Sequence, residues 1–148
     1  MANLSALWVA AAAFAMVALA LGLLAWLGMI RIPLVVAGKV RTGDIALSRD
    51  PWPTREKQIS NAFDNQFQLP VLFYLACGFS ILMQAGLADA ILAWAFVASR
   101  YAHALIFVTT NDVPKRFFAF SIGFFVLLAF WLLLLFRLAA VGIAFGLH

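Results

Sequence analysis

The stretch FFAFSIGFFVLLAFWLLLLF, residues 117–136, contains no charged residue. A helix needs about 20 apolar residues to cross a hydrocarbon layer roughly 30 Å thick, because it rises about 1.5 Å per residue. Residues 6–30 and 65–88 are also uncharged and long enough, and residues 90–111 carry a single charge at Arg100. The sequence therefore predicts four transmembrane helices, at about residues 4–30, 61–86, 89–110 and 115–140.

The composition supports a membrane protein. Hydrophobic residues make up 66% of the chain and charged residues 11%, against about 45–50% and 25% in soluble domains. The first apolar run is longer than the core of a signal peptide and no basic residue precedes it, so we expect a retained helix. Short connections make successive helices antiparallel neighbours. Residues 1–148 should thus form one all-α domain, an integral membrane four-helix up-down bundle.

The basic residues predict the orientation in the membrane. Six of the ten Lys and Arg residues fall between the first two spans, and two more lie between the last two. The positive-inside rule then makes the loops at 31–60 and 109–116 cytoplasmic, with both termini on the opposite side. The high isoelectric point, about 9.9, reflects this topology and attraction to anionic membrane lipid, and gives no reason to expect nucleic acid as a partner.

Arg100 is the most informative polar residue. A charged group near the bilayer centre costs about 2.5–3.5 kcal/mol on insertion scales, so its guanidinium must face acceptors. Asn61, Asp64, Asn65 and Gln68 are spaced i, i+3, i+4, i+7, which places them on one stripe of the second helix. We expect Arg100 to contact Asp64, Asn65 or Gln68, in its own chain or a neighbour. The stripe lines either a binding site or a polar seam between helices.

The remaining candidates extend this polar region toward the cytoplasmic loops. Lys57 lies one helical turn before the stripe, His103 shares a face of the third helix with Arg100, and Arg116 opens the fourth helix. Converging cations and amides suit a small anion that enters from the cytoplasmic side. With two histidines and Cys77 as the one cysteine, we expect no metal site.

Three segments of the sequence are NAFDNQFQLPVLFY (61–74), ASRYAH (98–103) and NDVPKRF (111–117). Together they resemble the MAPEG family, the membrane-associated proteins of eicosanoid and glutathione metabolism, and its bacterial branch in particular. The resemblance implies a homotrimer in the bacterial inner membrane, with sites at the boundaries between chains. It also implies glutathione as a co-substrate, which is conjugated to a lipophilic electrophile or reduces it. The alternative is a catalytically silent accessory subunit of a larger membrane assembly.

The resemblance also assigns residues. In glutathione-using members the second helix presents Arg-x-x-x-Asn-x-x-Glu, which falls either on Asn61, Asn65 and Gln68 or on Lys57, Asn61 and Asp64; both registers stay open. The third helix presents Arg-x-x-Tyr-x-x-x-Tyr, which falls on Arg100, His103 and Phe107, so the arginine is kept and both tyrosines are replaced. The arginine that stabilises the glutathione thiolate corresponds to Arg116, our candidate catalytic residue.

Overall fold

The computed structural model of the chain describes the backbone of residues 3–144 and the side chains of residues 3–140. Within these residues the secondary structure is entirely helical. The helices are α1 (Leu4–Val36), α2 (Thr54–Asp64), the short 3₁₀ helix η1 (Asn65–Phe67), α3 (Leu69–Leu82), α4 (Leu87–Val108) and α5 (Val113–Ala144). Helices α1, α4 and α5, together with the combined segment 54–82, are long and apolar enough to cross a membrane. This confirms the predicted four-span fold.

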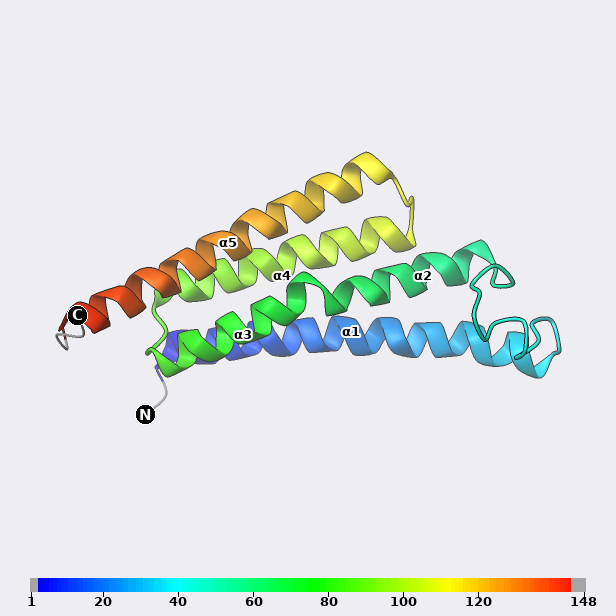
Figure 1. The fold of residues 1–148 in the computed structure, drawn as a ribbon, viewed down its shortest axis with the longest axis horizontal. Coiled ribbons are helices and arrows are strands. Elements are labelled where there is room, and N and C mark those ends of the chain that lie inside the picture. The colour runs from blue at the N-terminus through cyan, green and yellow to red at the C-terminus, as the bar shows by residue number, and fades with distance from the viewer. Residues whose placement is uncertain (1–2, 145–148) are drawn as a thin grey trace.

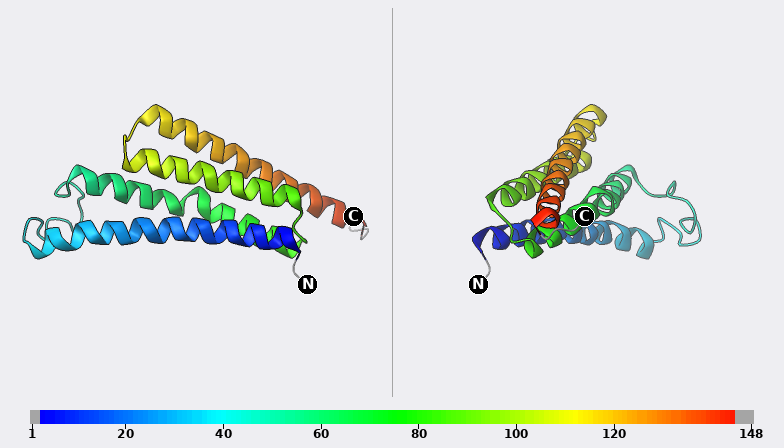
Figure 2. Two further views of the ribbon diagram at one scale, coloured as in Figure 1. Left: turned by 180° about the vertical axis from the view of Figure 1, so that it is seen from behind. Right: turned by 60° about the vertical axis from the view of Figure 1, so that its left-hand side comes forward.

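The four spans run alternately up and down (Figure 1). Helix α4 packs most extensively against α5 and α1, and α1 also contacts α2 and α3. We call the end that carries the α1–α2 and α4–α5 connections the loop end. The opposite end, where α1 begins and α5 finishes, is the terminal end (Figures 1 and 2). The predicted placement of the first and last helix ends on one side is therefore confirmed, whereas the compartment that each side faces stays a prediction.

Helix α1 is longer than expected and continues past residue 30 to Val36. Its Arg31 forms an ion pair with Glu56 of α2, so a charge that should have ended the span is instead neutralised by a neighbouring helix. The expected loop 31–60 shrinks correspondingly, because α2 already begins at Thr54. Near the loop end, α1 and α2 extend beyond the start of α5 (Figure 1).

The second span is not the continuous helix predicted at 61–86. It breaks at Gln68, whose φ of −103° and ψ of −107° lie outside the helical region, and α3 ends at Leu82. Pro70 explains the break, since it has no N–H to donate to the carbonyl of Gln66 and its ring obstructs that position. Gln68 therefore does not share one regular helical stripe with Asn61 and Asp64.

The apolar core lies between the four spans. Phe73 stacks on Phe96 with ring centroids 4.5 Å apart, and Phe130 packs against Phe73 at 6.5 Å. Cys77 is buried among these residues, with 2% of its surface exposed. A second cluster, which includes Leu23, Ile59 and Phe107, lies nearer the loop end. Close packing of this kind fixes how polar residues on different helices face one another.

Candidate functional site

A cleft of about 250 Å³ lies near the loop end, between η1, α4 and the start of α5. Three of its lining residues are polar and come from the expected set: Asn65, His103 and Arg116. The others are apolar, and most are aromatic: Phe107, Val113, Phe117 and Phe120. The fold thus brings one cation, one imidazole and one amide together in an aromatic hollow.

Arg116 is the cation of the cleft. Its guanidinium lies over the ring of Phe107, 3.8 Å from the centroid, and donates a hydrogen bond to the side chain of Asn111. Asn111 has a positive φ of 53°, a left-handed conformation that asparagine tolerates better than most residues. Asn111 is thus a positioning residue that the sequence analysis did not single out, although its place in the loop just before Arg116 was a usable signal.

The other two polar residues of the cleft are held by neighbouring groups. The His103 ring is 5% exposed and meets Phe107 edge-on at 5.5 Å and Phe120 at 5.9 Å. Asn65 donates from Nδ2 to the carbonyl of Asn61 at 2.8 Å. Aromatic packing therefore fixes the imidazole, and the preceding helical turn fixes the amide.

Arg100 is buried, as expected, but it turns to α5 and not to the second span. A terminal nitrogen of its guanidinium donates to the carbonyls of Ala119 and Phe120, at 3.1 and 3.0 Å. The ring of Phe120 also lies beneath the guanidinium, at 5.0 Å. The expected bond to Asp64, Asn65 or Gln68 within the chain is therefore wrong, because the guanidinium uses backbone carbonyls of α5 instead. A contact with a neighbouring chain stays a prediction.

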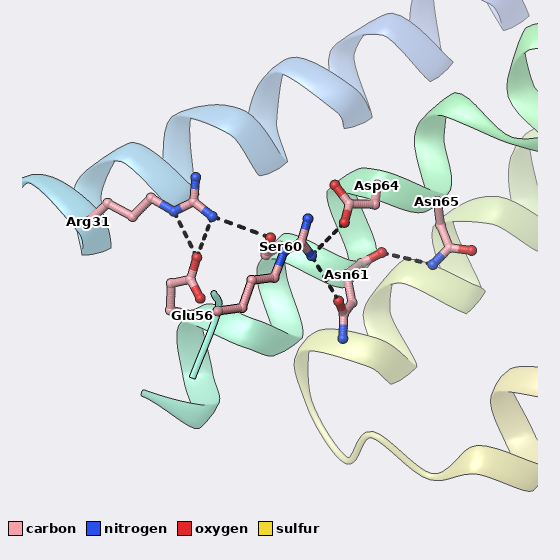
Figure 3. A network of polar contacts seen from close by, with 7 residues as sticks. Arg31, Glu56, Ser60, Asn61, Asp64 and Asn65 are labelled. Carbon is pink, nitrogen blue, oxygen red and sulfur yellow. Dashed lines mark hydrogen bonds and ion pairs between the residues drawn. The ribbon is translucent and has the colours of Figure 1, made fainter. Parts of the chain in front are cut away.

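The remaining expected residues point elsewhere at the loop end. Asp64 pairs with Arg49 at 2.7 Å, and Arg49 also reaches Asn61 at 3.4 Å (Figure 3). The Asp64 carboxylate raises the pKa of Arg49 above its usual value by accepting its hydrogen bond and by charge attraction. Lys57 donates to the backbone carbonyl of Asp50, and Gln68 is exposed. None of these four lines the cleft.

An ion pair between a half-buried arginine and a buried glutamate, which the sequence analysis missed, holds α1 to α2. The Arg31 guanidinium lies 2.6 Å from Glu56, whose side chain is fully buried, and it also approaches Ser60 at 3.4 Å (Figure 3). One Glu56 oxygen has no hydrogen-bond partner among the described residues. The two residues are 25 positions apart, so no local spacing in the sequence marks them as partners.

The start of α5 is fixed by Asp112. Its carboxylate accepts the Lys115 backbone N–H at 3.0 Å and pairs with the Lys115 ammonium at 3.2 Å. These interactions lower the pKa of Asp112 below its usual value. An acceptor before the first turn satisfies N–H groups that have no partner within the helix. Arg116 therefore projects from an anchored turn.

The cleft lining contains one residue of the types that commonly bind metal ions, His103. Within residues 3–144 the structure has no cluster of three His, Cys, Asp or Glu side chains that could hold a metal ion. The cleft offers instead a fixed cation, an imidazole and an amide, beside aromatic rings. Such groups can bind an anion and leave an apolar surface for a second, lipid-soluble molecule.

Fold and site together define a multi-pass membrane protein with a small cationic cleft near one end of a four-helix bundle. The family model of the MAPEG family matches residues 5–136, which include every residue of the cleft and all or most of each span. The chain belongs to the MAPEG family. No curated protein and no solved structure matches it.

Proposed function

We propose that the cleft binds a small anionic thiol of the glutathione type and promotes its addition to a lipophilic electrophile. The observation that carries the proposal is Arg116, a cation fixed over Phe107 and open to a cleft shared with His103 and Asn65. A nearby cation lowers the pKa of a thiol, and the thiolate is the nucleophilic form. Membership of the MAPEG family, which has glutathione-using members, supports the same chemistry.

In this proposal each residue has a limited task. Arg116 faces the sulfur, while Asn65 and His103 offer polar contacts to the rest of the thiol. The electrophile arrives from lipid along the aromatic rings. The thiolate sulfur forms a bond to one carbon of a polarised double bond, and the π bond breaks toward the other end. The atom that receives that electron pair takes up the proton that the thiol released, so the addition needs no further reactant.

The size of the cleft favours a site completed by a neighbouring copy. Ligand pockets are typically about 300–1,000 Å³, and the cleft of one chain measures about 250 Å³. Gln68 is exposed on the second span, and an exposed polar side chain at membrane depth needs a partner. We therefore include a homotrimer in the proposal, since a head-to-tail contact that closes gives a ring.

Calorimetric titration of the detergent-solubilised chain with glutathione tests the proposal. Hydrogen bonds to charged groups contribute about 1.5–3 kcal/mol, so Arg116→Leu should weaken binding by at least about tenfold. Lys115→Leu is the matched control, because it removes the adjacent cation, which does not line the cleft. It should bind as the wild type does.

A second function, a catalytically silent accessory subunit, is favoured by Arg100. Its guanidinium is buried and hydrogen-bonded to α5 carbonyls, which suits a structural role. A purified chain that releases no heat with glutathione and conjugates no generic electrophile would favour this second function. Heat that is unchanged by Arg116→Leu would instead move the binding site away from the cleft.

A further inference from the structure

A second hollow lies on another face of the bundle, between α1 and α4. It has a volume of about 400 Å³ and an almost wholly apolar lining, which includes Ala18, Gly22, Tyr101 and Leu105. A Cβ atom added at Gly22 would meet nothing within 4 Å. We call this hollow the α1–α4 groove. Ala18, Gly22, Tyr101 and Leu105 are exposed on this surface, on two helices that are long and apolar enough to cross a membrane.

The groove matches the depth of one lipid leaflet. The 22 residues of α4 span about 33 Å, close to the roughly 30 Å of the hydrocarbon layer, so Val108 marks its edge at the loop end. From Ala18 to Trp26 the groove covers about 12 Å of α1 at about 1.5 Å per residue. This is close to half of the hydrocarbon thickness, so the groove can accept a chain from one leaflet only.

A cation stands at the outer end of the groove. The Arg55 guanidinium lies over the ring of Trp26 at 4.8 Å and donates a hydrogen bond to the carbonyl of Val108. Trp26 and Val108 both line the groove. Arg55 belongs to none of the ion pairs between described residues. A guanidinium has five donors in a planar fork that fits phosphate oxygens, and tryptophan is enriched at membrane interfaces.

We propose that the α1–α4 groove binds one acyl chain of an anionic phospholipid, with the lipid phosphate on Arg55. The apolar lining, the length of one leaflet and the cation at the edge each match one part of that molecule. The groove lies apart from the cleft of Arg116, so this proposal does not depend on the proposed thiol chemistry.

Native mass spectrometry of the full chain in detergent, titrated with phosphatidylglycerol or with phosphatidylcholine of the same acyl chains, tests the proposal. Arg55→Gln keeps a donor for the Val108 carbonyl but removes the charge. A basic residue near a membrane surface contributes about 1 kcal/mol, so this variant should bind phosphatidylglycerol about fivefold more weakly and lose the preference over phosphatidylcholine. Lys115→Gln removes a charge from the same end and should leave the preference unchanged.

Variants that fill the groove complete the test. Gly22→Leu should reduce the binding of both lipids, whereas Gly28→Leu, on the same helix but outside the groove, should bind as the wild type does. Ala18→Leu replaces Gly22→Leu if that variant does not fold. Unchanged lipid binding by the filled variants overturns the proposal, as does an equal loss with Lys115→Gln. A changed number of chains in the Gly22→Leu assembly also overturns it, because the groove is then a contact between copies.

Discussion

Two arginine sites, one at the terminal end and one midway along the bundle, are built in opposite ways. At the terminal end, Arg137 of α5 contacts both carboxylate oxygens of Asp89, at 2.7 and 3.0 Å. Asp89 is fully buried and also accepts the Gly86 backbone N–H at 2.6 Å. Midway, Arg100 pairs with no acid among the described residues and donates to the α5 carbonyls of Ala119 and Phe120.

The difference shows what each depth in the membrane permits. At the edge a carboxylate can be buried, because an arginine, a backbone N–H and the start of α4 all favour its charge. Midway along the bundle, the Arg100 guanidinium fits because Gly123 beside it has no side chain. A Cβ on Gly123 would lie 2.4 Å from the guanidinium. The site at the terminal end therefore depends on the pairing of opposite charges, and the midway site depends on the room that Gly123 leaves for the Arg100 side chain.

The largest expected effect is at the edge. Arg137→Leu would leave the Asp89 carboxylate buried without its cation, and breaking a buried pair from one side costs about 3–5 kcal/mol. The midpoint of thermal unfolding in detergent should fall markedly. The double variant Asp89→Leu/Arg137→Leu should recover most of the loss, because no uncompensated charge remains. An unfolding midpoint of Arg137→Leu equal to that of the wild type would show that paired charge does not hold this end.

An intermediate effect is expected in the middle. Gly123→Ala should force Arg100 to move, at a cost of about 1–3 kcal/mol for overpacking. Gly78→Ala is the matched control, since a Cβ there meets nothing within 4 Å, and it should be as stable as the wild type. Combining Gly123→Ala with Arg100→Leu should cost less than the sum of the two changes, measured by the same unfolding assay. Additive costs would mean that the two residues do not share one space.

The smallest effect is expected at a third arginine, Arg49. Arg49 and Asp64 are 2.7 Å apart, like Arg137 and Asp89, but their side chains are 55% and 44% exposed. Exposed pairs contribute about 0–1 kcal/mol, so Asp64→Asn should change the free energy of unfolding by no more than this. Adding salt should reduce even that difference. A loss as large as that of Arg137→Leu would mean that the pair is buried in the assembled protein.

The number and type of the spans followed from the sequence because apolar length is a property of one segment at a time. The partners of the polar residues did not, since they depend on how segments pack. Arg100 was correctly predicted to point inward from its helix, yet the acceptors that it uses are backbone carbonyls, which every residue has. Arg31 and Glu56 belong to different helices, and no periodicity links them.

The candidate site, too, was predicted from the sequence only in part. Arg116, His103 and Asn65 share one cleft, and each was singled out from the sequence. Gln68 was expected on the same stripe as Asn65, but Pro70 interrupts the helix just after it. The effect of proline on helical hydrogen bonding was foreseeable. Its effect on the register of the preceding turns could not be foreseen, because that register depends on the neighbouring helices.

The burial of Cys77 makes the native chain a convenient starting point for chemical labelling. Its thiol is 2% exposed within the apolar core, and thiols buried in apolar surroundings are inert. The sequence has no other cysteine. A cysteine introduced at exposed Lys39, in the loop after α1, would thus be the accessible thiol of the whole chain. Labelling it with a membrane-impermeant maleimide from one side would assign the loop end to a compartment without first removing the native cysteine.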